Sequence, residues 1–383
     1  MTWSRMAGTR PRMTRRAAGR ALLGAAGALL APRARAAAID LAGELQVLSG
    51  KVVSTGVTGC VLGIGVRARA PVIAANGLRD VATNAPFVFD TAWHVASVTK
   101  MFTATVALQL AQEGKLPLDA PIARWLPDAP AADRIEMRHL LDHGSGLADY
   151  ANEAFLAAKP ADGVAFTPEE LMGFRDPKDL LFAPGSKAQY SNTGYLVAGR
   201  VIEAIEGRPL ADSFRVRIVE PLKLEGASFP GMAPLPPERV AHGYADTDGN
   251  GSLNDTLGLP WTAGWADNAL VADAPSLLTF TKALFNAELL DAQHVTLMQV
   301  PVLERDEVGQ PVAAYGLGVE VEAFEGLTWA GHSGSTFGYL TTLWHQPEND
   351  VTVVAGLNAY PEDKELLDKI TRRLMRLAMK AAA

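Results

Sequence analysis

The stretch Thr91–Gly114, TAWHVASVTKMFTATVALQLAQEG, carries the pattern around which the rest of the chain is organised. From Ser97 onward it predicts a helix, and apolar side chains cover nearly its whole circumference. A helix without a polar face is usually buried inside a domain. Ser97 and Lys100 open this helix, and Gly114 is a stop signal. The sequence therefore predicts a buried central helix with a serine and a lysine at its mouth.

The spacing of Ser97 and Lys100 has a chemical consequence. A buried lysine is costly unless its ammonium has a partner or a function. Three residues make about one helical turn, so the ammonium can lie beside the serine hydroxyl. A serine beside a lysine base is an arrangement for nucleophilic catalysis. The structural alternative is a helix-capping serine followed by a solvated lysine, and the apolar surroundings of Lys100 favour the catalytic pair.

The N-terminus has the layout of an export signal. Residues 1–36 contain eight arginines and no acidic residue, and residues 21–31 form a short apolar run. Ala34-Arg35-Ala36 offers a cleavage site, and Arg15-Arg16 is a twin-arginine pair of the kind used to export folded proteins. The apolar run is too short to remain as a membrane anchor. We therefore predict an exported, periplasmic or secreted bacterial protein; the structural alternative is a disordered basic tail.

Charge and cysteine content narrow the classes of partner. Removal of residues 1–36 would leave 347 of the 383 residues and lower the formal net charge from −7 to −15. Such an acidic surface argues against nucleic acid or anionic membrane as the main partner. Cys60 is the single cysteine, so no internal disulfide can form. Its apolar surroundings favour a small buried side chain over a nucleophile.

The hydrophobic pattern predicts an α+β fold. An amphipathic helix over 38–53 is followed by a hairpin of 57–68 with 71–76, and strands return near the C-terminus before a helix over 363–379. The returning strands are expected at 316–322, 327–331, 339–345 and 351–358. We expect an antiparallel sheet flanked by the N- and C-terminal helices, with an inserted helical lobe. Residues 37–383 then form one domain, with an α/β lobe over about 37–115 and 310–383 and an all-helical lobe over about 116–309.

A second motif, Tyr190-Ser191-Asn192, follows the loop residues Pro184, Gly185 and Ser186. A helix is expected to start near Asn192, so the triplet lies at a loop–helix junction where side chains can point into a cleft. Tyr190 beside a lysine ammonium could ionise more readily and act as a general base. Asn192 could donate to a substrate carbonyl and accept from Lys100. The structural alternative is an ordinary turn with Asn192 as the helix cap.

A third motif, His332-Ser333-Gly334-Ser335, lies on a strand that another strand follows. Gly334 removes a side chain where a substrate backbone could run along the strand edge. A hairpin turn with a surface histidine explains this piece equally well. The nucleophile elbow of α/β-hydrolases would need glycine at 335 and a following helix, so it is disfavoured. A fourth motif, LLDHGSGL at 140–147, is expected to be mainly structural.

Two patterns resemble metal sites and are rejected on their details. His139 and His143 are four residues apart on an expected helix, but no adjacent glutamate or third ligand accompanies them. Asp246–Gly251 opens like a calcium loop, but its twelfth position is Leu257 and flanking helices are not expected. We therefore predict no metal and no organic cofactor.

Taken together and in this order, the motifs ASVTK, LLDHGSGL, APGSKAQYSNTGY, YGLGVEV and GHSGSTFGYL are specific. The chain resembles the serine β-lactamase and penicillin-binding protein superfamily, on the branch of class C β-lactamases, D-alanyl-D-alanine carboxypeptidases and related esterases. The resemblance covers roughly residues 40–380 and implies the β-lactamase/transpeptidase-like fold.

The resemblance implies a role for each matching residue. Ser97 is expected to be the nucleophile and Lys100 to take its proton. Tyr190 would move protons to the leaving group and help activate water, and Asn192 would hold the substrate amide.

His332, Ser333 and Gly334 correspond to the family's third box, which also contacts substrate. The oxyanion hole would be formed by the backbone N–H groups of Ser97 and Ser335, two donors aimed at one developing oxyanion. His332 replaces the lysine common in true β-lactamases. A neutral histidine is a weaker anchor for a β-lactam carboxylate, so this replacement suits peptidase- or esterase-like members.

The sequence thus predicts an exported serine hydrolase that acts through an acyl-enzyme on amide or ester bonds, most like a D-alanyl-D-alanine carboxypeptidase or β-lactamase-related hydrolase. A carboxylesterase is the alternative within the same chemistry. A cell-wall binding protein that has kept the fold and lost turnover is the alternative of another class. The expected partners are a small peptide, β-lactam or ester, including a peptidoglycan stem peptide. No pattern in the chain indicates an oligomeric state.

Overall fold

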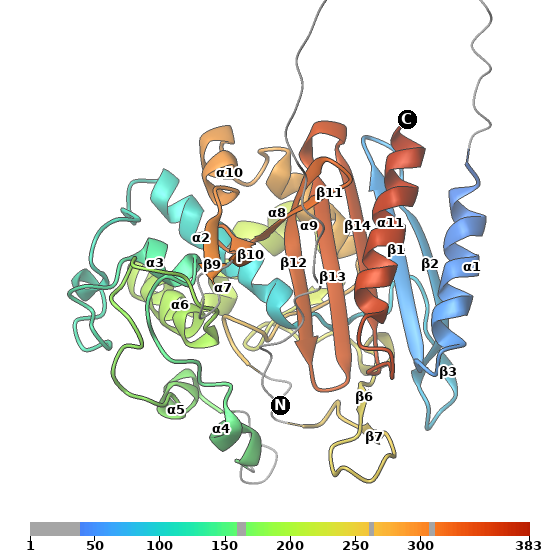
Figure 1. Cartoon of the computed structure of the whole chain (residues 1–383), viewed down its shortest axis with the longest axis horizontal. Coiled ribbons are helices and arrows are strands. Elements are labelled where there is room, and N and C mark those ends of the chain that lie inside the picture. The colour runs from blue at the N-terminus through green and yellow to red at the C-terminus, as the bar shows by residue number, and fades with distance from the viewer. Residues whose placement is uncertain (1–38, 159–165, 260–263, 306–310) are drawn as a thin grey trace, which may run out of the picture. The chain divides into compact units, whose positions relative to one another are not determined.

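The computed structural model describes residues 39–158, 166–259, 264–305 and 311–383, and the predicted export signal lies outside them. Asp40–Ala383 forms one compact unit. Among the described residues, nine strands build one sheet in the order β3-β2-β1-β14-β13-β12-β11-β10-β9 (Figure 1). Every pairing in this sheet is antiparallel. The predicted fold class, helices on a large antiparallel sheet, is confirmed.

Both ends of the unit contribute to the sheet, because β1 pairs with β14 from Cys60↔Leu357 to Val66↔Val351. The predicted hairpin is the β1–β2 pair. The strands of the large sheet are β1 (Gly59–Val66), β2 (Val72–Asp80), β3 (Ala85–Pro86), β9 (Val302–Arg305), β10 (Pro311–Tyr315), β11 (Glu320–Phe324), β12 (Leu327–Thr336), β13 (Tyr339–Gln346) and β14 (Val351–Leu357). The strand expected at 316–322 starts later, because Gly316 N bonds Val319 O in a turn where Gly318 has a φ of 85°.

Helices cover both faces of the central strands. Thr341 and Thr342 are neighbours on β13 and therefore point to opposite faces. Thr342 meets Thr371 of α11 (Leu366–Ala382), whereas Thr341 accepts a hydrogen bond from Trp93, four residues before Ser97. On the α11 face, α1 (Leu41–Val53) packs against β1 and β2 (Figure 1). The other face carries the elements that position Ser97.

The region between the two halves of the sheet carries the predicted inserted helices, but it is not all-helical, because two-residue strands lie at 227–228, 244–245, 254–255 and 271–272. Its elements are η2 (Ile122–Arg124), α3 (Met137–Leu141), α4 (Glu153–Ala157), α5 (Pro168–Gly173), α6 (Asn192–Glu206), α7 (Leu210–Phe214), η4 (Arg215–Val219), α8 (Glu220–Leu222), η5 (Pro237–Arg239), α9 (Ala274–Phe285) and α10 (Ala292–Met298). Helix α7 is followed directly by the π-helical turn η4, which begins at Arg215.

Two features tie this region to the sheet lobe. Helix α9 packs on β14, β1 and β13. A small sheet joins β4 (Trp93–His94) to β8 (Val271–Ala272) and β5 (Ala227–Ser228). A third sheet, β6 (Tyr244–Ala245) with β7 (Asn254–Asp255), forms the hairpin around the loop at 246–251.

Helix α2 (Thr99–Gln112) is the buried central helix that the sequence predicted. Phe102 is fully buried and stacks on Phe280 of α9 with ring centroids 3.8 Å apart. Lys100 is also fully buried. The helix is followed by Gly114 with a φ of 72°, which is the expected stop. Because α2 is buried from Thr99 to Leu108, it is a firmly packed support for the residues at its N-terminal end.

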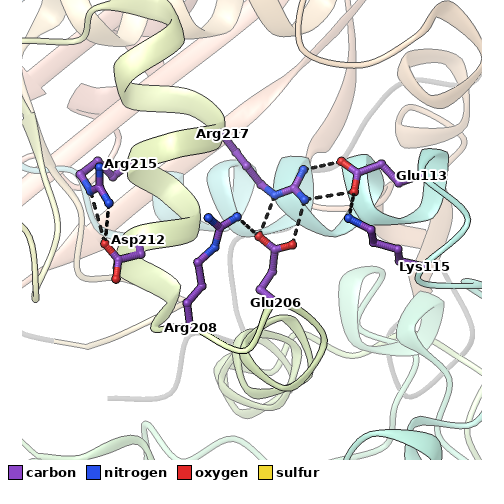
Figure 2. A network of polar contacts seen from close by, with 7 residues as sticks. All are labelled: Glu113, Lys115, Glu206, Arg208, Asp212, Arg215 and Arg217. Atoms are coloured by element: carbon purple, nitrogen blue, oxygen red, sulfur yellow. Dashed lines mark hydrogen bonds and ion pairs between the residues drawn. The ribbon is translucent and has the colours of Figure 1, made fainter.

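Charged side chains gather at the C-terminal end of α2 (Figure 2). Glu113 accepts hydrogen bonds from both Lys115 and Arg217, at 2.6 Å each. Arg217 also contacts Glu206 at 2.9 Å, and Glu206 contacts Arg208. The network joins the ends of α2 and α6 to η4.

Candidate active site

Ser97 lies in a short turn, η1 (Ala96–Val98), that leads into α2. Ala96 has a φ of 53°, a left-handed conformation that is uncommon for a residue with a Cβ. Strand β12 packs directly on this turn: a Cβ on Gly334 would lie 2.3 Å from Val95 O and 3.1 Å from Ser97 N. Glycine at 334 is therefore required for this close approach. The half-buried Ser97 side chain does not cap α2, so its hydroxyl is available for chemistry.

Lys100 Nζ makes three hydrogen bonds that use all of its donors. Nζ lies 3.1 Å from Ser97 Oγ, 2.7 Å from Asn192 Oδ1 and 3.0 Å from Asp267 O. Burial lowers the pKa of Lys100 to about 8, although the Asp267 and Asp149 carboxylates act in the opposite direction. A lysine with such a pKa is neutral in a substantial fraction of molecules near pH 8 and can then accept the proton of Ser97.

Asn192 is the first residue of α6, at the predicted loop–helix junction. Its amide is held in one orientation, because Oδ1 accepts from Lys100 and Nδ2 donates to Asp149 Oδ2 at 2.9 Å. The contact with Lys100 is the one expected from the sequence. Asp149 also accepts the backbone N–H of Asn192 at 3.1 Å. Asp149 therefore positions Asn192 against the lysine.

Tyr190 completes the group around the serine. Its hydroxyl is hydrogen-bonded to the Ser97 side chain, and Lys100 Nζ lies 5.0 Å from the centre of its ring. Burial raises the pKa of Tyr190 well above its usual value, although the Ser97 bond lowers it. The expectation that Tyr190 would ionise more readily is therefore wrong, since burial outweighs the hydrogen bond to Ser97. Tyr190 stays protonated near neutral pH and is suited to donating and relaying a proton.

Behind Tyr190 lies His143, from the LLDHGSGL motif. The two ring centroids are 4.2 Å apart, and the ring of Tyr315 lies 4.3 Å from His143 on another side. His143 Nδ1 accepts the backbone N–H of Ser191 at 3.2 Å. Burial holds the pKa of His143 well below its usual value, so the ring is neutral. The motif thus supports the Tyr190-Ser191-Asn192 loop from behind.

Strand β12 supplies the opposite wall. Strand β11 pairs with it only as far as Glu320↔Gly331, whereas β13 continues to Thr336. The Ser333 N–H points away from β13 and donates to Glu320 Oε1 at 3.3 Å. Because strand backbone alternates, the Ser335 N–H points to this same open edge. Ser97 N lies close to Gly334, so both donors of the predicted oxyanion hole are on this side of the site.

The His332 imidazole is engaged within the protein. It is 1% exposed, Nε2 lies 2.8 Å from the Tyr315 hydroxyl, and Nδ1 contacts Ser333 O. Burial, with a smaller contribution from Lys100, lowers the pKa of His332 to about 3. The side chain is therefore neutral, as the sequence suggested.

The structure thus brings Ser97, Lys100, Tyr190 and Asn192 together at the unpaired edge of β12. Sequence reasoning missed three acidic residues around them: Asp149, Asp267 and Glu320. Asp149 lies two residues after LLDHGSGL, and Glu320 is the last residue of YGLGVE. A single carboxylate in a loop or at the start of a strand does not by itself indicate an active-site residue. Their neighbours are distant in sequence, so their roles depend on the fold.

The residues considered as metal ligands serve other contacts. His139 Nδ1 accepts the Glu136 N–H, as His143 Nδ1 accepts that of Ser191. The Asp246 carboxylate accepts the backbone N–H of Gly249 and of Gly251, at 2.8 and 2.9 Å. Within the described ranges, no group of three or more His, Cys, Asp or Glu side chains could hold a metal ion. Nor does any described helix combine the length and hydropathy that a membrane span needs.

The chain matches the family model named Beta-lactamase over residues 40–376. It is 27% identical over 284 residues to a D-aminopeptidase of Brucella anthropi, a match that covers 74% of this chain and 53% of that protein. It is 36% identical over 185 residues to the esterase EstB of Burkholderia gladioli, covering 45% of this chain and 46% of that protein. The chain thus spans about half the length of these curated relatives.

Among solved structures, the D-amino acid amidase of Ochrobactrum anthropi SV3 superimposes with a TM-score of 0.81 at 26% identity. That match covers 90% of this chain and 100% of the amidase chain. It therefore includes both halves of the sheet and the helical region between them.

Proposed function

The chain belongs to the Beta-lactamase family, and from this premise we propose that it is a serine hydrolase working through an acyl-enzyme on Ser97. One observation carries the proposal: a fully buried lysine, with its pKa lowered to about 8, lies 3.1 Å from the serine hydroxyl. Serine is a weak nucleophile until a base takes its proton. Lys100 is the group placed to do so.

The proposed first step transfers the Ser97 hydroxyl proton to neutral Lys100 Nζ as Oγ attacks the substrate carbonyl carbon. The N–H groups of Ser97 and Ser335 hold the resulting oxyanion. Tyr190 passes its hydroxyl proton to the leaving group. Lys100 then returns a proton to Tyr190 through the hydrogen bonds that both make with the serine oxygen. The carbonyl–leaving group bond then breaks, and Ser97 is left as an ester.

In the second step a water enters the place of the leaving group. Lys100 takes its proton, relayed through the Tyr190 hydroxyl, as the water attacks the ester carbonyl, and the proton returns to Ser97 Oγ when the acid is released. One Nδ2 N–H of Asn192 is bonded to Asp149, and we propose that the second N–H binds the acyl part of the substrate.

We propose amides and esters of D-amino acids as the substrate class. Support comes from the relatives, which are a D-aminopeptidase, a D-amino acid amidase and an esterase. The neutral His332 offers no cation for a β-lactam carboxylate. The D-alanyl-D-alanine carboxypeptidase predicted from the sequence remains the second candidate, on the strength of the family resemblance. A binding protein without turnover is the candidate of another class.

The testing experiment is a parallel assay on D-phenylalanine amide, p-nitrophenyl butyrate, a D-Ala-D-Ala peptide and nitrocefin, with Ser97→Ala as the blank. We expect the amide and the ester to be hydrolysed and the blank to be inactive. Faster hydrolysis of the D-Ala-D-Ala peptide would favour the carboxypeptidase. No turnover of any compound by folded wild type would favour the binding protein.

We also propose that the protein is exported, because residues 1–36 have the layout of a signal. Expression of the full chain in a bacterium, with fractionation and N-terminal sequencing, tests this. Mature protein starting near Ala37 outside the cytoplasm supports export, and an intact N-terminus in the cytoplasm contradicts it.

A further inference from the structure

Glu320 lies where the pairing of β11 and β12 ends. It is paired with Gly331, and beyond this point β12 continues to Thr336 with β13 on its other side. The Glu320 side chain reaches along the vacated edge: Oε1 accepts the Ser333 hydroxyl at 2.7 Å and the Ser333 N–H at 3.3 Å. A protein carboxylate thus takes both donors of Ser333, two residues before the oxyanion donor Ser335.

Among the side chains that the structure describes, no lysine or arginine forms an ion pair with this carboxylate, and Lys100 lowers its pKa only from beyond ion-pair distance. Among the described residues, its single ion-pair contact within 4.0 Å is His332 Nδ1, at 3.4 Å. His332 is held neutral by burial. The Glu320 side chain is nevertheless 28% exposed. Burial raises its pKa to about 7 against the opposing Ser333 hydrogen bonds, so at pH 8 most molecules carry the charge. Glu320 therefore carries a negative charge that reaches solvent and has no ion pair with a described lysine or arginine.

The position of Glu320 places it nearer the leaving group of the substrate than the acyl part. In the proposed mechanism the leaving group departs beside Tyr190, which gives it a proton. The ring of His332 lies 6.5 Å from the ring of Tyr190, and its Nδ1 lies 3.4 Å from Glu320 Oε1. The proposed acyl-part contact, Asn192, is bonded to Lys100 and to Asp149 instead. The leaving group is thus the part of the substrate that faces Glu320.

We propose that Glu320 makes the leaving-group side of this site selective for uncharged or ammonium-bearing groups and against groups that carry a carboxylate. The Ser333 hydroxyl and N–H would otherwise attract an anion, and Glu320 already occupies them. A second carboxylate within several ångströms would be repelled by the first, which at the effective dielectric of a protein surface corresponds to roughly 10- to 100-fold in rate. Leaving groups without a carboxylate, such as the ammonia of a primary amide, a small amine or an alcohol, are not repelled.

This inference rests on the proposed serine hydrolase but not on a D-amino acid acyl group, and the test separates the two. Two pairs of substrates differ in one leaving-group charge each: 3-carbamoylphenyl against 3-carboxyphenyl butyrate, and D-Phe-D-Ala amide against D-Phe-D-Ala. Rates at pH 8 are measured for wild type, Glu320→Gln, Glu320→Asp and the matched control Glu322→Gln. Glu322 is two residues further along β11 and pairs with Arg372.

We expect wild type to prefer the uncharged member of each hydrolysed pair by roughly 10- to 100-fold in kcat/KM. Glu320→Gln should narrow that ratio to within about threefold, whereas Glu320→Asp and Glu322→Gln should keep most of it. A wild type without this preference overturns the inference, as does an unchanged ratio in folded Glu320→Gln. If only the butyrates are hydrolysed, the proposal of D-amino acid substrates is rejected. The ratio of kcat/KM between the uncharged and the carboxylate-bearing butyrate can still be measured. No Ser97-dependent turnover of any compound overturns both proposals.

Discussion

The two ends of α2 hold charged groups in different ways: Lys100 is fully buried, whereas Glu113 is partly exposed. At the N-terminal end, the three acceptors that Lys100 bonds directly are neutral, namely a hydroxyl, an amide oxygen and a backbone carbonyl. At the C-terminal end, Glu113 is held between Lys115 and Arg217 (Figure 2). Burial lowers the pKa of Lys100 to about 8, whereas the hydrogen bond from Arg217 lowers the pKa of Glu113 to about 2.

The difference lies in what each environment does to the charged form. Neutral partners satisfy hydrogen bonds without compensating desolvation, so the lysine gives up its proton more readily. Opposite charges compensate desolvation and keep the ions charged. The first arrangement provides reactivity and the second joins elements, here α2, α6 and η4. We therefore expect substitutions at the first end to change rates and substitutions at the second end to change stability.

Ser97→Ala should give the largest effect. Removal of the nucleophile should lower kcat by about 10⁵- to 10⁶-fold, because no other group can form the acyl-enzyme. The melting temperature should hardly change, since the hydroxyl does not cap α2. Steady-state assays with a thermal melt check both. Activity within tenfold of wild type would remove Ser97 from the mechanism.

Lys100→Met and Lys115→Met compare the lysines at the two ends of the helix. Loss of the proposed base should cost about 10³- to 10⁴-fold in kcat. The Lys115 variant should keep its activity, because that side chain is 54% exposed and remote from the serine. Similar rate losses in both variants would mean that α2 itself, rather than the Lys100 amine, had been disturbed.

Glu206→Gln tests the network at the C-terminal end. The Glu206 side chain is 6% exposed and contacts two arginines, so removal of its charge leaves Arg217 poorly compensated. We expect a loss of roughly 3 kcal/mol in the free energy of unfolding with kcat retained below the melting transition. Denaturant titration measures it. The control Glu220→Gln breaks an exposed pair with Arg215 and should cost about 0.5 kcal/mol. Equal losses in the two variants would contradict the distinction.

The two ends should also respond to different ranges of pH. Neutral Lys100 is the active form, so kcat/KM should rise with pH and level off above about 8, with roughly 100-fold less activity at pH 6. Glu113 and Glu206 have pKa values lowered from 4.5 to about 2, so their contribution to stability is complete above pH 4.5 and is lost as pH falls toward 2. Activity that is constant from pH 6 to 9 would exclude Lys100 as the base.

The sequence predicted the parts of this site that depend on local pattern. The apolar circumference of residues 97–114 located α2, and loop residues before Tyr190 located the start of α6. The predicted direction of the Tyr190 pKa shift was wrong. The burial that raises this pKa depends on His143 and Tyr315, which come from other parts of the chain. The role of Glu320 also required the register of β11 on β12, since that register places it beside Ser333.

The central claim is that Lys100 activates Ser97 as a nucleophile. The most direct measurement is the rate and position of labelling by a fluorophosphonate, followed by mass spectrometry of the digested protein. We predict one adduct, on the peptide that contains Ser97, formed at least 100-fold more slowly in Lys100→Met and not at all in Ser97→Ala. Labelling of another residue, or of Ser97 at an unchanged rate in Lys100→Met, would contradict the account.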